Sequence, residues 1–165
     1  MTSSRRLMLI AMAATALLAS PARAAQISGP NPEVQAAVDA AMSAGMAGDM
    51  VKLHAQYAPD CVFVDEFAPF RWAGPNALDR YLMSGGRMYQ ETEHRDGKVT
   101  FGAPTFVYVS GDQAFLVEPV SGNATVRGRP YAQQGAFAFS LARIEGRWKI
   151  TSQTWTKAGE TLNPY

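Results

Sequence analysis

The chain has 165 residues, 47% of them hydrophobic and 18% charged, and its formal net charge at pH 7 is +1. This length suits one domain with its own hydrophobic core, and the near-neutral charge disfavours a nucleic-acid-binding protein, whose affinity comes from neutralising phosphates. Cys61 is the only cysteine, so no internal disulfide can form, and its apolar neighbours indicate a core position.

The first 24 residues have the composition of a secretory signal peptide. Arg5 and Arg6 give a basic start, residues 7–19 are apolar, and Ala22-Arg23-Ala24 is the small-x-small pattern that a signal peptidase cleaves. The apolar stretch is shorter than the about 20 residues of a membrane span, and no later segment is long enough. We therefore predict a signal peptide at 1–24, no stable membrane span, and a periplasmic or secreted protein. The Sec route and, given the paired arginines, the twin-arginine route both fit.

Two helices are predicted after a flexible leader at 25–30. Asn31-Pro32-Glu33 offers a capping side chain, a proline at the first helical position and an acid in the first turn, and apolar residues follow at helical spacing until Gly48. Asp49 can cap a second helix, which ends before Pro59 because proline cannot continue it.

A third helix and a series of strands complete the chain. Residues 61–64 are predicted to form a first strand, and Pro75 starts a helix that we expect to stop at Gly85-Gly86. From Lys98 onward, β-branched and aromatic runs indicate strands joined by hairpin turns at Ser110-Gly111-Asp112, Arg127-Gly128-Arg129-Pro130 and Glu145-Gly146. This order predicts an α+β fold in one domain, with N-terminal helices packed on a strongly curved antiparallel sheet.

Three phrases within this plan carry a family resemblance: AGDMVKLHAQYAPDCVFVD, WAGPNALDRYL and FSLARIEGRWKITSQTWTK. In this order they resemble the nuclear transport factor 2-like superfamily, which includes SnoaL-like polyketide cyclases, scytalone dehydratase and ketosteroid isomerase. The resemblance implies a cystatin-like cone, an α+β barrel, over 31–158 with a C-terminal tail at 159–165. It also implies a conical pocket for a small hydrophobic molecule and, in many members, a homodimer formed through the outer sheet face.

The resemblance points to Asp65 as a general base. Laying YAPDCVFVD on the matching phrase of ketosteroid isomerases puts Asp65 at their catalytic aspartate, which moves a proton beside a carbonyl. An apolar pocket would raise the proton affinity of this carboxylate toward a useful range. The alternative is an acid at a strand end that caps a turn or pairs with Arg71 or Arg80.

The same alignment leaves this base without its usual partners. The tyrosine and the protonated aspartate that stabilise the oxyanion in the isomerases fall on Ala41 and Ser140. Alanine donates no hydrogen bond and serine donates only an ordinary one, and losing such a donor costs about 2.7–4 kcal/mol in barrier height. Steroid isomerisation by that mechanism is therefore not expected.

Strand alternation, oriented by the resemblance, suggests which side chains face the pocket. In the strand around 131–143 the resemblance places Gln134, Ala136, Ala138 and Ser140 inward. The predicted ligand-binding residues are Tyr57, Trp72, Gln134, Ser140, Thr151, Gln153 and Trp155. An indole beside polar groups suits an apolar pocket with a few oriented contacts, and the alternative is that Trp155 fills the core.

Other polar residues have weaker assignments. Glu118 lies mid-strand beside Pro119, which favours an exposed edge position, with the cavity as the alternative. His54 is expected to face inward or lie at the rim, and His94 is predicted to be solvated because its turn is polar. No zinc-binding or phosphate-binding pattern occurs, so we predict neither a metal nor another cofactor.

Together these features predict an exported SnoaL-like domain that binds a small hydrophobic or aromatic molecule in a conical pocket. In its enzymatic form it would be a cofactor-free isomerase, cyclase or dehydratase with Asp65 as base. The alternative is a non-catalytic periplasmic binding or assembly module whose cone is filled by its own side chains.

Overall fold

The computed structural model describes residues 29–162, so the predicted signal peptide lies outside the described residues. The elements are α1 (Pro32–Ala47), α2 (Met50–Gln56), β1 (Tyr57–Val64), β2 (Arg71–Trp72), α3 (Ala77–Glu91), β3 (Arg95–Phe101), β4 (Phe106–Ser110), β5 (Gln113–Val126), β6 (Arg129–Ile144) and β7 (Arg147–Leu162). The last strand continues through 159–162, which we expected to be a tail. Within 29–162, no helix has the length and apolar character of a membrane span.

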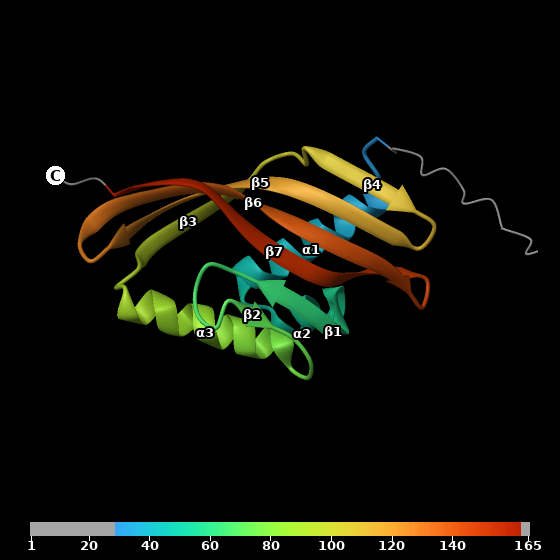
Figure 1. The fold of residues 1–165 in the computed structure, drawn as a ribbon, viewed down its shortest axis with the longest axis horizontal. Coiled ribbons are helices and arrows are strands. Elements are labelled where there is room, and N and C mark those ends of the chain that lie inside the picture. Colours follow the sequence, from blue (N-terminus) through green and yellow to red (C-terminus); the bar gives the residue numbers. More distant parts are fainter. Residues whose placement is uncertain (1–28, 163–165) are drawn as a thin grey trace, which may run out of the picture.

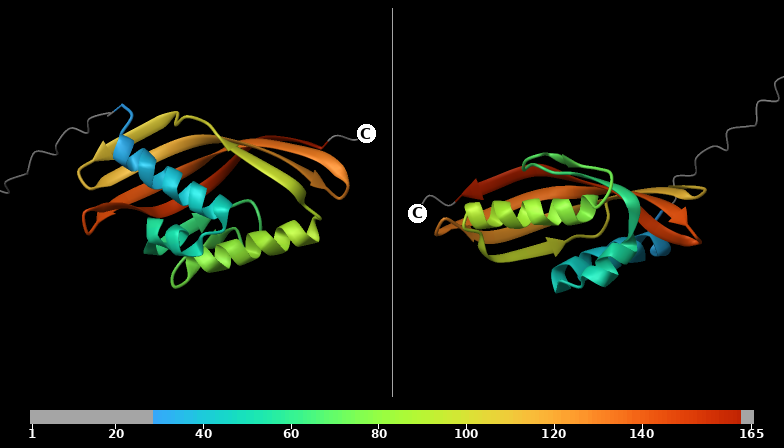
Figure 2. Two further views of the ribbon diagram at one scale, coloured as in Figure 1. Left: turned by 180° about the vertical axis from the view of Figure 1, so that it is seen from behind. Right: turned by 90° about the horizontal axis from the view of Figure 1, so that it is seen from below.

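The strands form one curved sheet, and the helices gather on one of its faces (Figures 1 and 2). The strand order is β2-β1-β7-β6-β5-β3, and β4 pairs with β5 beyond the end of β3. All pairs are antiparallel except β1 with β7, which is parallel, so the sheet is mixed and not wholly antiparallel as predicted. The predicted α+β fold with a strongly curved sheet is confirmed.

The first two helices begin where the sequence indicated, but α2 ends at Gln56 and the strand that we predicted at 61–64 already begins at Tyr57. The side chain of Asn31 accepts hydrogen bonds from the backbone N–H groups of Glu33 and Val34, both at 3.1 Å, which satisfies donors that a helix start leaves free. Gly48 ends α1 in the left-handed conformation, with φ of 67°. Asp49 caps α2 by accepting from the N–H of Lys52 at 3.1 Å.

The third helix does not stop at Gly85-Gly86 and continues to Glu91. Each glycine costs about 1 kcal/mol relative to alanine in a helix, a penalty that tertiary packing can outweigh. A Cβ on Gly85 would lie 3.5 Å from Cζ of Phe67, an ordinary van der Waals contact, so this part of α3 lies beside the loop after β1.

The predicted hairpin turns are confirmed. Arg127 and Gly128 have φ of 49° and 74°, and Glu145 and Gly146 have φ of 50° and 77°. Positive φ at both turn residues matches the twist of the flanking strands and favours glycine at the second position.

The inward register of β6 is the reverse of the one we predicted. Phe139 and Leu141 are fully buried against the helices, whereas Gln134 is exposed and Ser140 belongs to the outer set. Burying a large apolar side chain contributes about 1.5–3 kcal/mol, so the face with phenylalanine and leucine turns toward the core. The small side chains of Ala136 and Ala138 lie on the outer face with Ser140.

Glu118 is buried and not at an exposed edge. It is only 3% exposed and shares the inner face of β5 with the buried residues Leu116 and Val120, and β5 is not an edge, because β6 flanks it on one side and β3 and β4 share the other. Within the described part of the chain, its Oε2 atom has no hydrogen-bond partner. Burial, with a contribution from the negative charge of Asp39, raises the pKa of Glu118 to about 7.

This pKa predicts a pH-dependent loss of stability. Between pH 4.5 and about 7 the folded state holds a proton on Glu118 that the unfolded chain has released, so the free energy of unfolding falls as pH rises. The full cost, on the order of 3 kcal/mol at about 1.4 kcal/mol per pH unit, is present above pH 7. Glu118→Gln removes the titration, so its stability relative to the parent should rise by this amount between pH 4.5 and 8.

Urea unfolding of both proteins at the two pH values measures this difference. The exposed acid Glu91 on α3 provides the control Glu91→Gln, whose stability relative to the parent should be the same at both pH values. A Glu118→Gln difference that does not change with pH would contradict the assignment.

Candidate functional site

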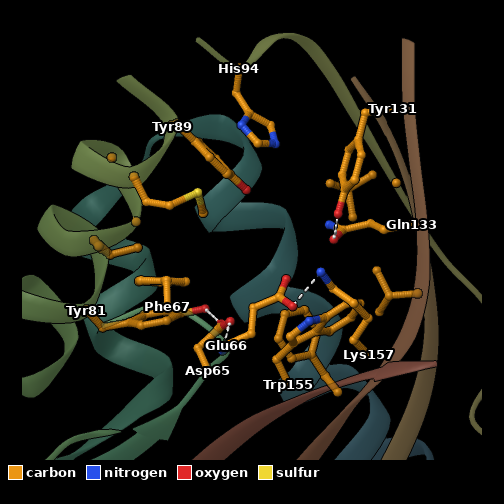
Figure 3. Close-up of a pocket in the computed structure, with 18 of the residues that line it drawn as sticks. Asp65, Glu66, Phe67, Tyr81, Tyr89, His94, Tyr131, Gln133, Trp155 and Lys157 are labelled. Carbon is orange, nitrogen blue, oxygen red and sulfur yellow. Dashed lines mark hydrogen bonds and ion pairs between the residues drawn. The ribbon is translucent and has the colours of Figure 1, made fainter. Parts of the chain in front are cut away.

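A cavity of about 510 Å³ lies between α3, the segment after β1 and the inner face of the long strands. Its walls are largely aromatic and aliphatic, and its polar residues other than tyrosines are Asp65, Glu66, His94, Gln133 and Lys157. Figure 3 shows Asp65 and Tyr81 on one wall, with Trp155, Lys157 and Gln133 opposite. This is the apolar pocket with few polar groups that is typical of small-molecule sites.

Asp65 follows β1 directly and is held in place at the cavity wall. Its backbone N–H donates to the carbonyl of Phe70 at 3.1 Å. Its Oδ2 accepts from the hydroxyl of Tyr81 at 2.8 Å, and its Oδ1 accepts from the N–H of Glu66 at 2.7 Å. Among residues 29–162 it forms no ion pair with Arg71 or Arg80, so the predicted alternative of an arginine partner is absent.

The pKa of Asp65 is raised above its ordinary value. Burial is the largest cause, because it disfavours the charged form. The hydrogen bonds from Tyr81 and from the N–H of Glu66 act in the opposite direction, since they stabilise the carboxylate. The raised proton affinity is the property that a general base in an apolar pocket needs.

An aromatic cluster behind the wall positions Tyr81. Its ring stacks on Phe63 with centroids 4.6 Å apart and meets the edge of Trp72 at 5.2 Å. Trp72 donates its indole N–H to the hydroxyl of Ser84 at 3.1 Å. Tyr57 lies against Phe63 and donates its hydroxyl to the side chain of Gln153.

Three predicted ligand-binding residues, Tyr57, Trp72 and Gln153, therefore lie in the layer that supports the cavity wall. They are buried and none of them lines the cavity. They fix the position of Tyr81 and, through it, that of Asp65.

Of the other four predicted ligand-binding residues, one lines the cavity and three do not. Trp155 lines the cavity and packs on Phe137 with ring centroids 5.1 Å apart. Thr151 donates its hydroxyl to the carbonyl of Ser140 at 3.1 Å, at the bulge where β6 and β7 shift register, and neither residue lines the cavity. Gln134 lies outside the lining as well.

Glycine at 135 is required for the position of Trp155. A Cβ there would lie 2.5 Å from Cη2 of the indole and 2.3 Å from the carbonyl oxygen of Thr156, closer than real Cβ contacts. The indole therefore lies directly over the backbone of β6, which the predicted register had not indicated.

A charged pair that the sequence did not reveal also lines the cavity. Lys157 Nζ lies 2.6 Å from Glu66 Oε2 and 2.6 Å from Glu160 Oε2. Burial lowers the pKa of Lys157, but the two carboxylates outweigh this effect and the net pKa is raised. The parallel pairing of β1 with β7 brings Glu66 and Lys157 together across the chain, and a local sequence pattern cannot show such a pairing.

His94 lies at the cavity and is not a solvated turn residue. The Thr92 hydroxyl donates to the carbonyl of Met88 at 2.6 Å, and its oxygen lies 2.7 Å from Nδ1 of His94. We therefore assign the proton of the neutral ring to Nδ1, which leaves Nε2 as an acceptor. Burial lowers the pKa of His94, and Tyr89 stacks on the ring at 4.7 Å.

The remaining candidates lie elsewhere. His54 forms an exposed pair with Asp79, with Nε2 2.8 Å from Oδ1, outside the cavity lining. Ala41 is fully buried in the core, so neither it nor Ser140 brings a donor to the cavity. In the part of the chain that the structure describes, no group of three or more acidic, histidine or cysteine residues could hold a metal ion.

The family described as the SnoaL-like domain matches residues 34–155. The chain is similar in structure to hexachlorocyclohexane dehydrochlorinase LinA-type3 from Novosphingobium barchaimii LL02, with a TM-score of 0.63 and 16% identity over 79% of this chain and 90% of that one. It is similar to a ketosteroid isomerase-like protein from Erwinia carotovora atroseptica SCRI1043, with a TM-score of 0.60 and 21% identity over 78% and 95% of the two chains.

A third similar structure is a nuclear transport factor 2 (NTF2-like) superfamily protein from Salmonella enterica subsp. enterica serovar Typhimurium str. LT2. Its TM-score is 0.61, with 15% identity over 78% of this chain and 90% of that one. No curated protein matches the sequence. At these identities the solved structures share only the fold with this chain, and the SnoaL-like match over residues 34–155 confirms the resemblance seen in the sequence.

The hydrogen bond between Tyr81 and Asp65 makes a testable prediction. Tyr81→Phe removes a donor to the carboxylate, so the pKa of Asp65 should rise further above its ordinary value. Carboxyl-carbon NMR titration of both proteins measures this shift. Tyr108→Phe, which changes a tyrosine on β4 outside the cavity lining, should leave the titration unchanged. An equal or lower pKa in Tyr81→Phe would show that Tyr81 is not the donor.

Proposed function

The chain belongs to the SnoaL-like domain family, and from this membership and the cavity we propose that it binds a small, mostly apolar molecule and that Asp65 acts on it as a general base without a cofactor. One observation carries the proposal. The Asp65 carboxyl reaches the wall of an apolar cavity, where burial raises its pKa and neutral donors hold it in place. An isomerase, cyclase or dehydratase reaction fits, since each can begin with removal of a proton.

His94 adds a second polar group to this site. Its Nε2 is an acceptor at the part of the cavity lined by Tyr89 and Tyr131, away from Asp65 (Figure 3). A ligand hydroxyl could bind there while an acidic C–H bond faces Asp65. A structural neighbour named as a dehydrochlorinase supports an enzymatic use of such a cavity and does not identify a substrate for this chain.

Non-catalytic binding is the second candidate function. It is favoured by the positions of Ala41 and Ser140, which bring no donor to a developing oxyanion. Each such missing donor costs about 2.7–4 kcal/mol in barrier height. In addition, both Asp65 oxygens already accept one hydrogen bond.

A bicyclic ketone with acidic α-hydrogens, 2-tetralone, separates the two candidates. Its binding should change the fluorescence of Trp155, an effect that Trp155→Phe removes. In D₂O the protein should speed exchange of the α-hydrogens, and Asp65→Asn should slow this exchange by about 10²–10⁴-fold while binding stays within a few-fold.

Asp60→Asn provides the control, because Asp60 is an exposed acid on β1 outside the cavity lining. Binding without exchange would favour the non-catalytic candidate. Failure of 2-tetralone and other apolar probes to bind would overturn both candidates.

The proposal includes export and self-association. Residues 1–24 support export by their signal-peptide pattern, and the exposed rings of Phe106 and Phe115 on the sheet support a homodimer. Native mass spectrometry of protein from the periplasm of an expressing bacterium should give a dimer of protomers that lack residues 1–24. Protomers that retain these residues would contradict export, and a monomer at micromolar concentration would contradict the homodimer.

A further inference from the structure

We infer that the ligand of this cavity is an organic cation, an amine or ammonium compound with an aromatic or alicyclic body. The inference rests on the proposed function, because it names the class of molecule that the same cavity would take. It comes from the charges and rings that line the cavity.

Acidic groups outnumber basic ones at the cavity. Asp65 and Glu66 line it, and Glu160 lies beside the lining residues Lys157 and Tyr131. Among the described lining residues, Lys157 is the only lysine or arginine. Its Nζ atom already lies 2.6 Å from a carboxylate oxygen of each of the two glutamates. His94 adds no positive charge near neutral pH, because burial lowers its pKa. The charges at the cavity therefore sum to a net negative value, which favours a positively charged ligand.

Among the described residues, Asp65 is the cavity acid that no basic side chain contacts, and the charge of Lys157 is the weakest of the effects on its pKa. Its described partners at hydrogen-bond distance are the hydroxyl of Tyr81 and the backbone N–H of Glu66, both neutral. No lysine or arginine of residues 29–162 forms an ion pair with it. A ligand ammonium beside Asp65 would supply the missing charge in a partly buried setting, where an ion pair is screened less than at the surface.

The walls around this acid suit a cation as well. Aromatic rings line the cavity on several sides: Phe67, Tyr81, Tyr89, Tyr131, Phe137 and Trp155. The faces of such rings carry partial negative charge, and organic ammonium groups bind against them. Tyr81 itself stacks on Phe63 and Phe67, so a cation near Asp65 would bind against the other lining rings.

A positive charge also meets a need that the protein leaves open. Proton removal by Asp65 creates negative charge on the ligand, and Ala41 and Ser140 bring no donor to stabilise it. A cationic centre beside the reacting bond stabilises that charge from within the ligand itself. An anionic ligand has the opposite effect, since it adds like charge beside Asp65 and Glu66.

Three probes with the same naphthalene ring test the inference. They are 2-(1-naphthyl)ethylamine, which is protonated at pH 7, 2-(1-naphthyl)ethanol, which is neutral, and 1-naphthylacetate, which is anionic. Isothermal titration calorimetry of the whole mature chain at low salt should give the amine about tenfold tighter binding than the alcohol, and the acetate the weakest. Asp65→Asn should weaken the amine about tenfold and leave the alcohol within twofold, and Asp60→Asn should change neither.

The outcomes separate this inference from the proposed function. If the alcohol binds as tightly as the amine, the inference of a cationic ligand is wrong, and the proposal that the cavity binds a small molecule is kept. If neither these probes nor 2-tetralone bind, the proposed function fails and the inference with it. If Asp65→Asn does not fold, the salt dependence of binding provides the test instead. Raising NaCl from about 20 mM to about 500 mM should weaken binding of the amine several-fold and leave binding of the alcohol unchanged. Equal responses of amine and alcohol to salt would overturn the inference.

Discussion

The cavity exists because α3 is anchored to β1 and β2 and not to the long strands that it faces. Ala77 and Leu78 are buried at its start, Ser84 accepts the indole N–H of Trp72, and Tyr81 stacks on Phe63 while donating to Asp65. These contacts lie on one side of the helix. Gly85 and Gly86 line the cavity and carry no side chain, so the helix takes little space from it there. The ribbon views show α3 beneath the sheet (Figure 1).

This anchoring also sets the electrostatics of the site. The hydroxyl that ties α3 to the end of β1 is the same one that stabilises the Asp65 carboxylate, so the position of the wall and the proton affinity of the acid are coupled. Glu66 extends from the next residue to Lys157 on β7, which joins this wall to the far one through a charged pair. A ligand that displaces Lys157 from Glu66 would loosen that connection as it binds.

Much of the fold could be predicted because its signals are local. The Asn31 cap, the left-handed Gly48 and the paired turn residues at 127–128 and 145–146 each act within a few residues. The prediction of which face of β6 points inward was wrong, because alternation defines two faces without showing which one the helices cover. Phe139 and Leu141 on the other face were the better guide. Asp65 lies at the cavity as the family phrase implied, whereas His94 and Lys157 reach it only through tertiary pairing.

Two acids in this domain show why position alone does not make a base. Glu118 and Asp65 are both shielded from water, and burial raises the pKa of each. Glu118 has an oxygen without a described partner and reaches a pKa of about 7, so it is largely protonated in mildly acidic solution, and it lies outside the cavity lining. Asp65 receives two neutral donors that favour its charged form, and it lines the cavity. A base must be both ionised and within reach of the ligand. These two conditions favour Asp65 over Glu118 as the base that we propose, and they leave Glu118 as a determinant of stability.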